Sequence, residues 1–153
     1  MSLALSLSPQ VFAILSALLE ERLGLHYDLG ERELLADRVS PRATELGFDS
    51  LLDYYYFLRY DPGGDSELAL LVDALVVNET YFFREVAALK VLVTELVPKL
   101  IAQGARPRIW CAACSTGEEP LTLAILLDEA GLLDQVTLVA SDISARALTQ
   151  ARR

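Results

Sequence analysis

Apolar residues recur at helical spacing through the first part of the chain. Phe12, Leu15, Leu19 and Leu23 fall on one stripe, and Ser8 followed by Pro9 is a favourable N-cap and first helical position. This pattern predicts a helix over about residues 9–24. Similar spacing, interrupted by glycine-containing turns, predicts further helices at about residues 30–46, 50–60, 65–77 and 84–103. The Ser40-Pro41 pair is expected to disturb the second of these helices.

The pattern changes after Pro107. A short apolar run at residues 109–112 is followed by a loop of small residues and by a helical pattern at about residues 118–130. A second, β-branched run at residues 136–140 ends at Ser141-Asp142. A strand, a tight loop, a helix and a second strand that ends in an acid form the opening unit of a doubly wound α/β domain. The sequence ends about one turn into what is predicted to be the next helix.

Composition narrows the classes of partner. The chain has 153 residues, 53% of them hydrophobic, and a formal net charge of −9. This content is enough to bury a core, and the negative charge disfavours nucleic acid and anionic lipid. A membrane span needs about 18 to 20 consecutive apolar residues, and no run in this sequence is that long. No membrane insertion is therefore expected. The two cysteines form no disulfide framework, which suits a cytoplasmic location.

The loop at residues 113–117 is the first candidate binding site. Small residues there let a ligand approach the backbone, and the following helix offers free N–H groups at its start. Asp142 lies at the end of the second strand, where an acid can accept hydrogen bonds from ribose hydroxyls. A helix cap explains Asp142 equally well. Glu118 and Glu119 could reach a ligand, although the helix dipole alone explains acids at a helix start.

The cysteines offer a rival interpretation. Trp110-Cys111-Ala112-Ala113-Cys114 has the form of a thioredoxin redox centre, in which a helix start lowers a thiol pKa. That family also needs a downstream proline facing the dithiol, and no proline follows Pro120. A zinc site is disfavoured because two cysteines and the single His26 supply at most three ligands. The favoured interpretation is that both cysteines are small buried hydrophobes.

Three segments together resemble the CheR family of chemotaxis receptor methyltransferases. Taken alone, NETYFFRE at residues 78–85 could be an ordinary helix start with Arg84 paired to an acid. Taken with the other two segments, it resembles the N-x-T-x-F-F-R-E signature of that family. WCAACSTGEEP at residues 110–120 resembles its nucleotide-binding loop, and VASDIS at residues 139–144 resembles its second strand. The resemblance implies a small all-helical domain at residues 1–84. It also implies the start of a Rossmann-like S-adenosylmethionine-binding domain at residues 85–153, which would be incomplete.

The resemblance also implies roles for individual residues. Arg84 would be catalytic, and the cofactor would be contacted by Asn78, Thr80, Arg84, Glu118, Glu119 and Asp142. The second helix of the family is thought to face the receptor, which implies partner contacts by Arg32, Arg38 and Arg42. The family's catalytic tyrosine and most of its sheet would lie beyond Arg153. The chain alone is therefore expected to be inactive.

The implied reaction is methylation of glutamate side chains on the cytoplasmic helices of chemoreceptors, with S-adenosylhomocysteine as the product. A glutamate with a pKa of about 4.3 is already ionised near neutral pH, so methyl transfer needs alignment but neither a base nor a metal. Two other functions remain open. One is a thioredoxin-like oxidoreductase, and the other is a non-catalytic module that binds a receptor or a nucleotide.

Overall fold

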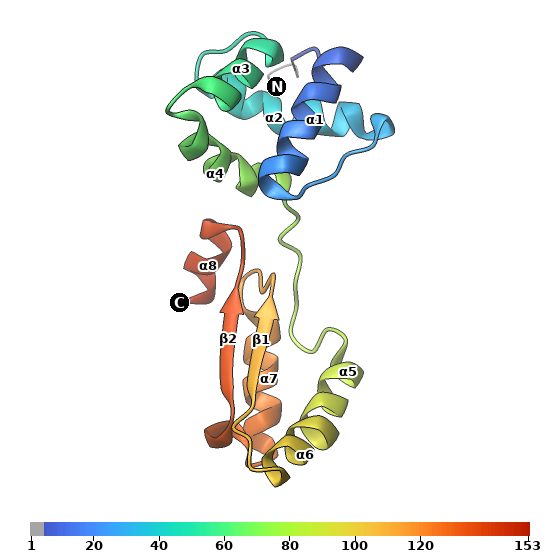
Figure 1. The fold of residues 1–153 in the computed structure, drawn as a ribbon, viewed down its shortest axis with the longest axis vertical. Helices are drawn as coiled ribbons and strands as arrows, with labels where there is room; N and C mark the ends of the chain where they lie inside the picture. The colour runs from blue at the N-terminus through green and yellow to red at the C-terminus, as the bar shows by residue number, and fades with distance from the viewer. Residues whose placement is uncertain (1–4) are drawn as a thin grey trace. The chain divides into compact units, whose positions relative to one another are not determined.

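The computed structural model describes residues 5–153, which divide into two compact units between Val76 and Val77 (Figure 1). Each unit has a hydrophobic core of its own. The first is all-helical, and the second combines helices with a small parallel sheet, as the sequence predicts for the fold class. The division lies before the NETYFFRE segment, whereas the expected domain boundary lies after Arg84.

Residues 5–76 of the first unit form four α-helices and one short 3-10 turn. Ser8 accepts the N–H of Val11 (3.2 Å) and so caps the first helix, which ends at Gly24 in the left-handed region (φ 71°). Its elements are α1 (Pro9–Leu23), η1 (Leu29–Glu31), α2 (Arg32–Glu45), α3 (Leu51–Tyr60) and α4 (Gly64–Leu75). These bounds lie within a few residues of the predicted ones.

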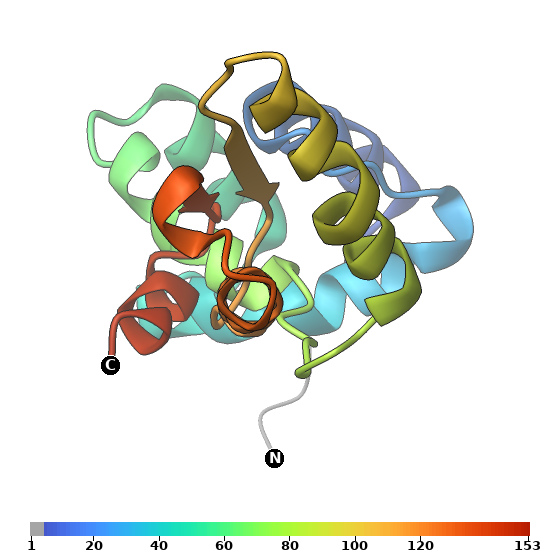
Figure 2. The same cartoon turned by 90° about the horizontal axis from the view of Figure 1, so that it is seen from below.

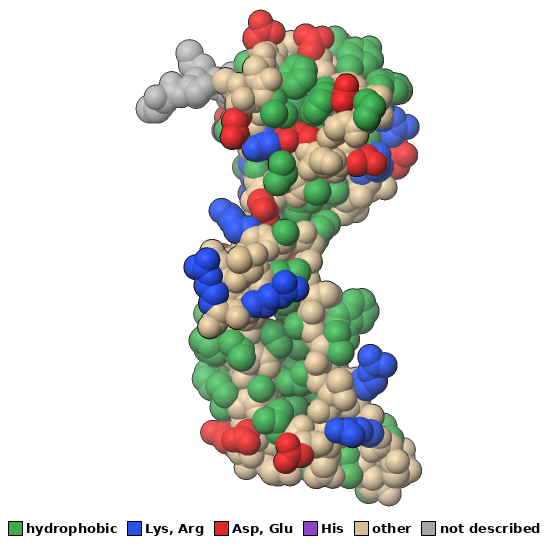
Figure 3. Space-filling model, turned by 90° about the vertical axis from the view of Figure 1, so that its left-hand side faces the viewer, with side chains coloured by type: hydrophobic (Ala, Val, Ile, Leu, Met, Phe, Trp, Pro, Cys, Tyr) green, Lys and Arg blue, Asp and Glu red, His purple; other side chains and the backbone are tan. Residues whose placement is uncertain are grey.

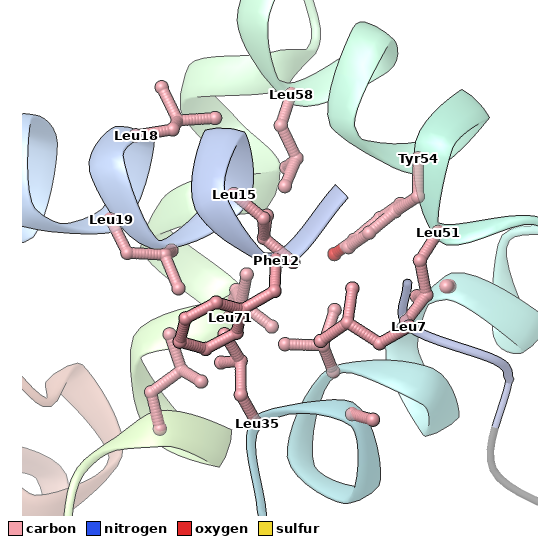
Figure 4. Packing of buried hydrophobic residues seen from close by; sticks show 14 of the residues in the cluster. Leu7, Phe12, Leu15, Leu18, Leu19, Leu35, Leu51, Tyr54, Leu58 and Leu71 are labelled. Carbon is pink, nitrogen blue, oxygen red and sulfur yellow. The ribbon is translucent and has the colours of Figure 1, made fainter. Parts of the chain in front are cut away.

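The helices of the first unit enclose one core. Phe12 and Leu15 of α1 pack with Leu35 of α2 and Leu71 of α4, and all four side chains are buried (Figure 4). Tyr54 of α3 is also completely buried, and its hydroxyl points into the cluster. A buried hydroxyl requires a hydrogen-bond partner, so this core must also contain a polar group.

Glu67 of α4 supplies that polar group. Its carboxylate accepts the Tyr54 hydroxyl proton (2.7 Å) and the Nε–H of Arg42 (2.9 Å). Only 5% of the Glu67 side chain is exposed, so the Arg42 guanidinium provides the charge compensation that a buried carboxylate needs. Burial, followed by the bond to Glu67, raises the pKa of Tyr54. The three side chains join α2, α3 and α4.

Pro41 does not interrupt α2, contrary to the prediction from the sequence. The helix runs without a break from Arg32 to Glu45. Pro41 is exposed and lies close to the C-terminal end, so its missing N–H removes only one internal hydrogen bond. Val39 and Ala43 on either side are completely buried. We attribute the continuity of the helix to this packing.

The second unit contains the two strands. Its elements are α5 (Val86–Val91), a π-helical turn η2 (Leu92–Leu96), α6 (Val97–Ala102), β1 (Arg108–Ala112), α7 (Glu118–Glu129), η3 (Leu133–Gln135), β2 (Thr137–Ser141) and α8 (Ala145–Ala151). Strands β1 and β2 are parallel, with Trp110 opposite Val139. Helix α7 runs alongside the strands (Figures 1 and 2). Its residues Leu123 and Leu127 share a core with Cys111 of β1.

The predicted helix at residues 84–103 is present but is not uniform. It begins at Val86, and its middle forms the π-helical turn. This wider turn ends two residues before Pro98, whose nitrogen has no hydrogen to donate to the Thr94 carbonyl. Val93 and Val97 both enter the core of the second unit. Among residues 5–153, no helix is both long and apolar enough to cross a bilayer.

The buried ion pair leads to a stability prediction. Replacing Arg42 by Met leaves the Glu67 carboxylate buried without its cation, which should destabilise the first unit by about 3–5 kcal/mol. Urea unfolding followed by circular dichroism measures this change. The control is Arg59→Met, which breaks the exposed pair with Glu21 and should leave the midpoint nearly unchanged. Equal effects of the two substitutions would contradict this description of the core.

Candidate functional site

The loop between β1 and α7 has an unusual backbone. Ala113 (φ 60°), Ser115 (φ 48°) and Gly117 (φ 99°) all lie in the left-handed region, which only glycine adopts without strain. Gly117 has a second constraint, because an added Cβ would lie 3.1 Å from the Cβ of Ala151 in α8. Such a loop keeps its shape only if the surrounding structure holds it in place.

Asp142 provides that support. Its Oδ2 accepts the N–H of Ser115 (2.7 Å), and its Oδ1 accepts the N–H of Ser144 (2.8 Å). The N-cap of α8 is Ser144, whose hydroxyl accepts the N–H of Ala147 (3.0 Å). Asp142 therefore lies outside the cap position and ties the β1–α7 loop to the turn after β2. A carboxylate has about four acceptor positions, so two remain for further donors.

The two adjacent glutamates point to different places. The Oε2 of Glu118 accepts the hydroxyl proton of Thr116 (2.7 Å), which keeps this carboxylate beside the loop. Glu119 lies beside Cys111 of β1, where its charge contributes to the raised thiol pKa. Of the pair, Glu118 is therefore the one associated with the loop.

The NETYFFRE segment approaches this region at two points. The Nδ2 of Asn78 donates to the Ser144 hydroxyl (3.4 Å), and the N–H of Phe83 donates to the Thr122 hydroxyl of α7 (3.1 Å). Thr80 lies between these two points along the chain. Arg84 is exposed; its Nη1 donates to the Glu79 carbonyl (3.1 Å), and its guanidinium lies 5.7 Å from the Tyr81 ring centre.

One buried polar atom in the loop has no partner among the described residues. Ser115 is 8% exposed, and its Oγ makes no hydrogen bond. Buried hydroxyls in native proteins nearly always have a partner. An unpaired hydroxyl on the residue whose N–H donates to Asp142 fits a loop that exchanges hydrogen bonds with a ligand.

Both cysteines are buried free thiols. Burial, and then the nearby Glu119, raises the pKa of Cys111 to about 11, and burial also raises the pKa of Cys114. A redox or nucleophilic cysteine needs a lowered pKa instead. The environment of these thiols therefore disfavours the thioredoxin-like alternative and favours a packing role.

A hollow of about 410 Å³ lies between α7, β2 and α8. Hydrophobic side chains are gathered on this side of the second unit, as Figure 3 shows. Its lining comprises Cys114, Gly117, Pro120, Leu121, Ala124, Leu138, Ala140, Ser141, Leu148, Ala151 and Arg152. The loop residue Gly117 and the strand residue Ser141, which directly precedes Asp142, both line this hollow.

The three arginines proposed for partner contact have different environments. Arg42 binds Glu67 and also Glu45 (2.8 Å), so its guanidinium is occupied within the first unit. Arg38 is half-buried and donates to the carbonyl of Leu75 at the end of α4. Arg32 lines a surface groove between the start of α2 and the segment before α1.

Comparison with known families assigns both units. Residues 10–76 match the model of the CheR methyltransferase all-alpha domain, and residues 78–153 match that of the CheR methyltransferase SAM-binding domain. The chain belongs to the CheR methyltransferase family. The loop, Asp142 and the NETYFFRE segment all lie within the part that matches the SAM-binding model.

Three relatives illustrate the extent of the similarity. Chemotaxis protein methyltransferase 2 of Vibrio cholerae is 35% identical over 86% of this chain and 47% of its own length. Chemotaxis protein methyltransferase 1 of Pseudomonas aeruginosa is 33% identical over 92% of this chain and 54% of its own length. The chemotaxis protein methyltransferase of Vibrio parahaemolyticus is 35% identical over 97% of this chain and 56% of its own length. The chain thus spans about half the length of these curated relatives.

Thr122 makes a contact within the site region that sequence analysis missed. Its hydroxyl accepts the Phe83 N–H, which connects α7 to a segment 39 positions earlier in the chain. The available signal was a polar residue between Leu121 and Leu123 in an otherwise apolar run. A threonine in a helix can bond its own backbone, so this signal did not indicate a distant partner.

The raised thiol pKa values lead to a second prediction. Cys111 and Cys114 in the folded protein should react with iodoacetamide far more slowly than in urea, because the thiolate is the reactive form. Mass spectrometry after timed alkylation at pH 7.5 measures this difference. Fast alkylation of the native protein at that pH would contradict the buried, packing role.

The same shift predicts a loss of stability at high pH. The pKa of Cys111 is raised from 9.0 to about 11, so the native state favours the neutral thiol. Its contribution to stability is fully present below about pH 9 and is lost as the pH rises toward 11. Melting temperatures across this range should show that Cys111→Ala is less sensitive to alkaline pH than the unchanged chain.

Proposed function

We propose that this chain forms part of an S-adenosylmethionine-dependent methyltransferase that esterifies glutamate side chains of chemoreceptors. The arrangement around Asp142 is the observation that carries the proposal. One carboxylate holds the β1–α7 loop and the β2–α8 turn together, and it retains acceptor positions for a ligand. The match of residues 78–153 to a SAM-binding domain supports S-adenosylmethionine as that ligand.

The residues of the second unit fit such a cofactor. Asp142 would accept hydrogen bonds from ribose hydroxyls, and the unpaired Ser115 hydroxyl and the N–H groups at the start of α7 would face the same ligand. Glu118 would add negative charge beside the loop, with Glu119 one position farther along α7. Asn78 and Thr80 would close the site from the NETYFFRE segment.

Arg84 has the chemistry to hold a carboxylate. Its guanidinium can donate two parallel N–H bonds, which fixes both the position and the orientation of the partner. The bound cofactor would supply an activated methyl group. The work of the protein is then to align a carboxylate oxygen with that group and to exclude water, without any proton transfer.

The proposed substrate is a glutamate on a cytoplasmic helix of a chemoreceptor, which places the protein in the cytoplasm. The names of the relatives, which are chemotaxis protein methyltransferases, support this assignment. Within the first unit, we assign receptor contact to the α2 face that carries Arg32 and Arg38. Arg42, although it belongs to the same proposed set, is held mainly by Glu67.

Removing the Asp142 carboxylate tests the cofactor site. Asp142→Ala should weaken binding of S-adenosylhomocysteine by about 2–4 kcal/mol, because charge-assisted hydrogen bonds contribute about 1.5–3 kcal/mol each. Isothermal titration calorimetry on the 153-residue chain measures the affinity. Asp128→Asn, which changes an exposed carboxylate at the other end of α7, is the control and should bind like the unchanged chain. Unchanged affinity of the Asp142 variant would remove this residue from the site.

A methylation assay tests the reaction class. Radiolabelled S-adenosylmethionine and receptor cytoplasmic fragments are incubated with this chain and, separately, with the Vibrio cholerae relative. We expect base-labile methyl esters with the relative and far fewer with this chain, because it spans about half of that protein. Transfer to a base-stable position instead would contradict glutamate as the acceptor.

A further inference from the structure

Thr122 joins the backbone segments that carry two of the proposed cofactor residues. Its side chain is completely buried in α7. The hydroxyl donates to the carbonyl oxygen of Glu118 (2.6 Å) and accepts the N–H of Phe83 (3.1 Å), the residue directly before Arg84. One atom therefore contacts the main chain at both places.

The direction of these bonds is fixed by their chemistry. A threonine hydroxyl has one proton and two acceptor lone pairs. The Phe83 N–H can only donate, so the hydroxyl proton must go to the Glu118 carbonyl. In the observed arrangement, the one hydroxyl of Thr122 makes both bonds.

The Arg84 segment needs support from outside. Phe83 (φ 61°) and Glu85 (φ 51°), on either side of Arg84, both lie in the left-handed region, which is strained for residues with a Cβ. The contacts of Arg84 itself are local, with Glu79 and Tyr81. The bond from Phe83 to Thr122 therefore anchors this strained turn to a rigid helix.

We propose that Thr122 is a positioning residue that sets the location of Arg84 relative to Glu118 and the cofactor loop. This inference rests on the proposed function, since it concerns the same site. Without the hydroxyl, the Phe83 N–H loses its acceptor and the strained turn can relax, which moves Arg84. The helix itself needs no such hydroxyl, because a bond from a threonine to its own helix does not strengthen it.

Two substitutions separate positioning from packing. Thr122→Val keeps the shape but removes the hydroxyl, and Thr122→Ser keeps the hydroxyl. The matched control is Thr94→Val, because the Thr94 hydroxyl makes the same kind of bond to the Lys90 carbonyl (2.9 Å) on an exposed helix surface. All variants are made in the 153-residue chain.

The first measurement needs no ligand. Amide hydrogen exchange at Phe83 should accelerate at least tenfold in Thr122→Val and stay within threefold of the unchanged chain in Thr122→Ser and Thr94→Val. The melting temperature of Thr122→Val should fall by no more than a few degrees, because the Phe83 N–H loses its acceptor at a partly exposed position. Unaltered exchange at Phe83 in Thr122→Val would overturn the proposal.

The second measurement is the affinity for S-adenosylhomocysteine. We expect about tenfold weaker binding by Thr122→Val and nearly full recovery by Thr122→Ser. Equal losses in the Val and Ser variants, accompanied by lower melting temperatures, would indicate a packing role and overturn the proposal. If Thr122→Val does not fold, Thr122→Ala replaces it with the same expectations for exchange at Phe83 and for affinity.

The two hypotheses fail in different ways. If the unchanged chain binds no S-adenosylhomocysteine, the proposed function fails, while exchange at Phe83 still decides whether Thr122 anchors the turn. If the unchanged chain binds the ligand and Thr122→Val binds it equally well, the positioning role fails and the proposed function stands.

Discussion

The second unit depends on a single carboxylate placed where two chain reversals meet. Asp142 fixes the loop after one strand and the turn after the next, and it does so through backbone N–H groups. Because the loop contains three residues in the left-handed region, this attachment helps to offset the strain of its backbone. The same attachment makes the loop rigid before any ligand arrives, which reduces the entropy lost on binding.

Much of the fold could be predicted from local patterns, and the long-range contacts could not. Helical periodicity predicted α1 and α7, and the β-branched run predicted β2, because each depends on neighbouring residues alone. The pair between Arg42 and Glu67 joins residues 25 positions apart, and neither sequence neighbourhood indicates the other. The family resemblance implied partner contact for Arg42, and the structure adds a contact of its guanidinium with the buried Glu67.

In the candidate site, too, local sequence patterns did not predict the long-range contacts. The positions of the loop and of Asp142 after successive strands could be predicted, because they follow from the topology of the fold. Thr122 could not, because its role depends on how the Arg84 segment folds back onto α7. Likewise, the sequence did not distinguish Glu118 from Glu119. Glu118 is held by Thr116 of the preceding loop, whereas Glu119 lies beside Cys111 of β1.

The single tryptophan of the chain, Trp110, lies next to the candidate site. It is 68% exposed, and it lies on β1 three positions before the loop begins. Its indole Nε1–H donates to the Ser141 hydroxyl (2.9 Å), directly before Asp142. Indole fluorescence is sensitive to polarity and hydrogen bonding. The molecule thus carries an intrinsic optical reporter at the edge of its candidate site, and that reporter receives no contribution from tryptophan in the helical unit.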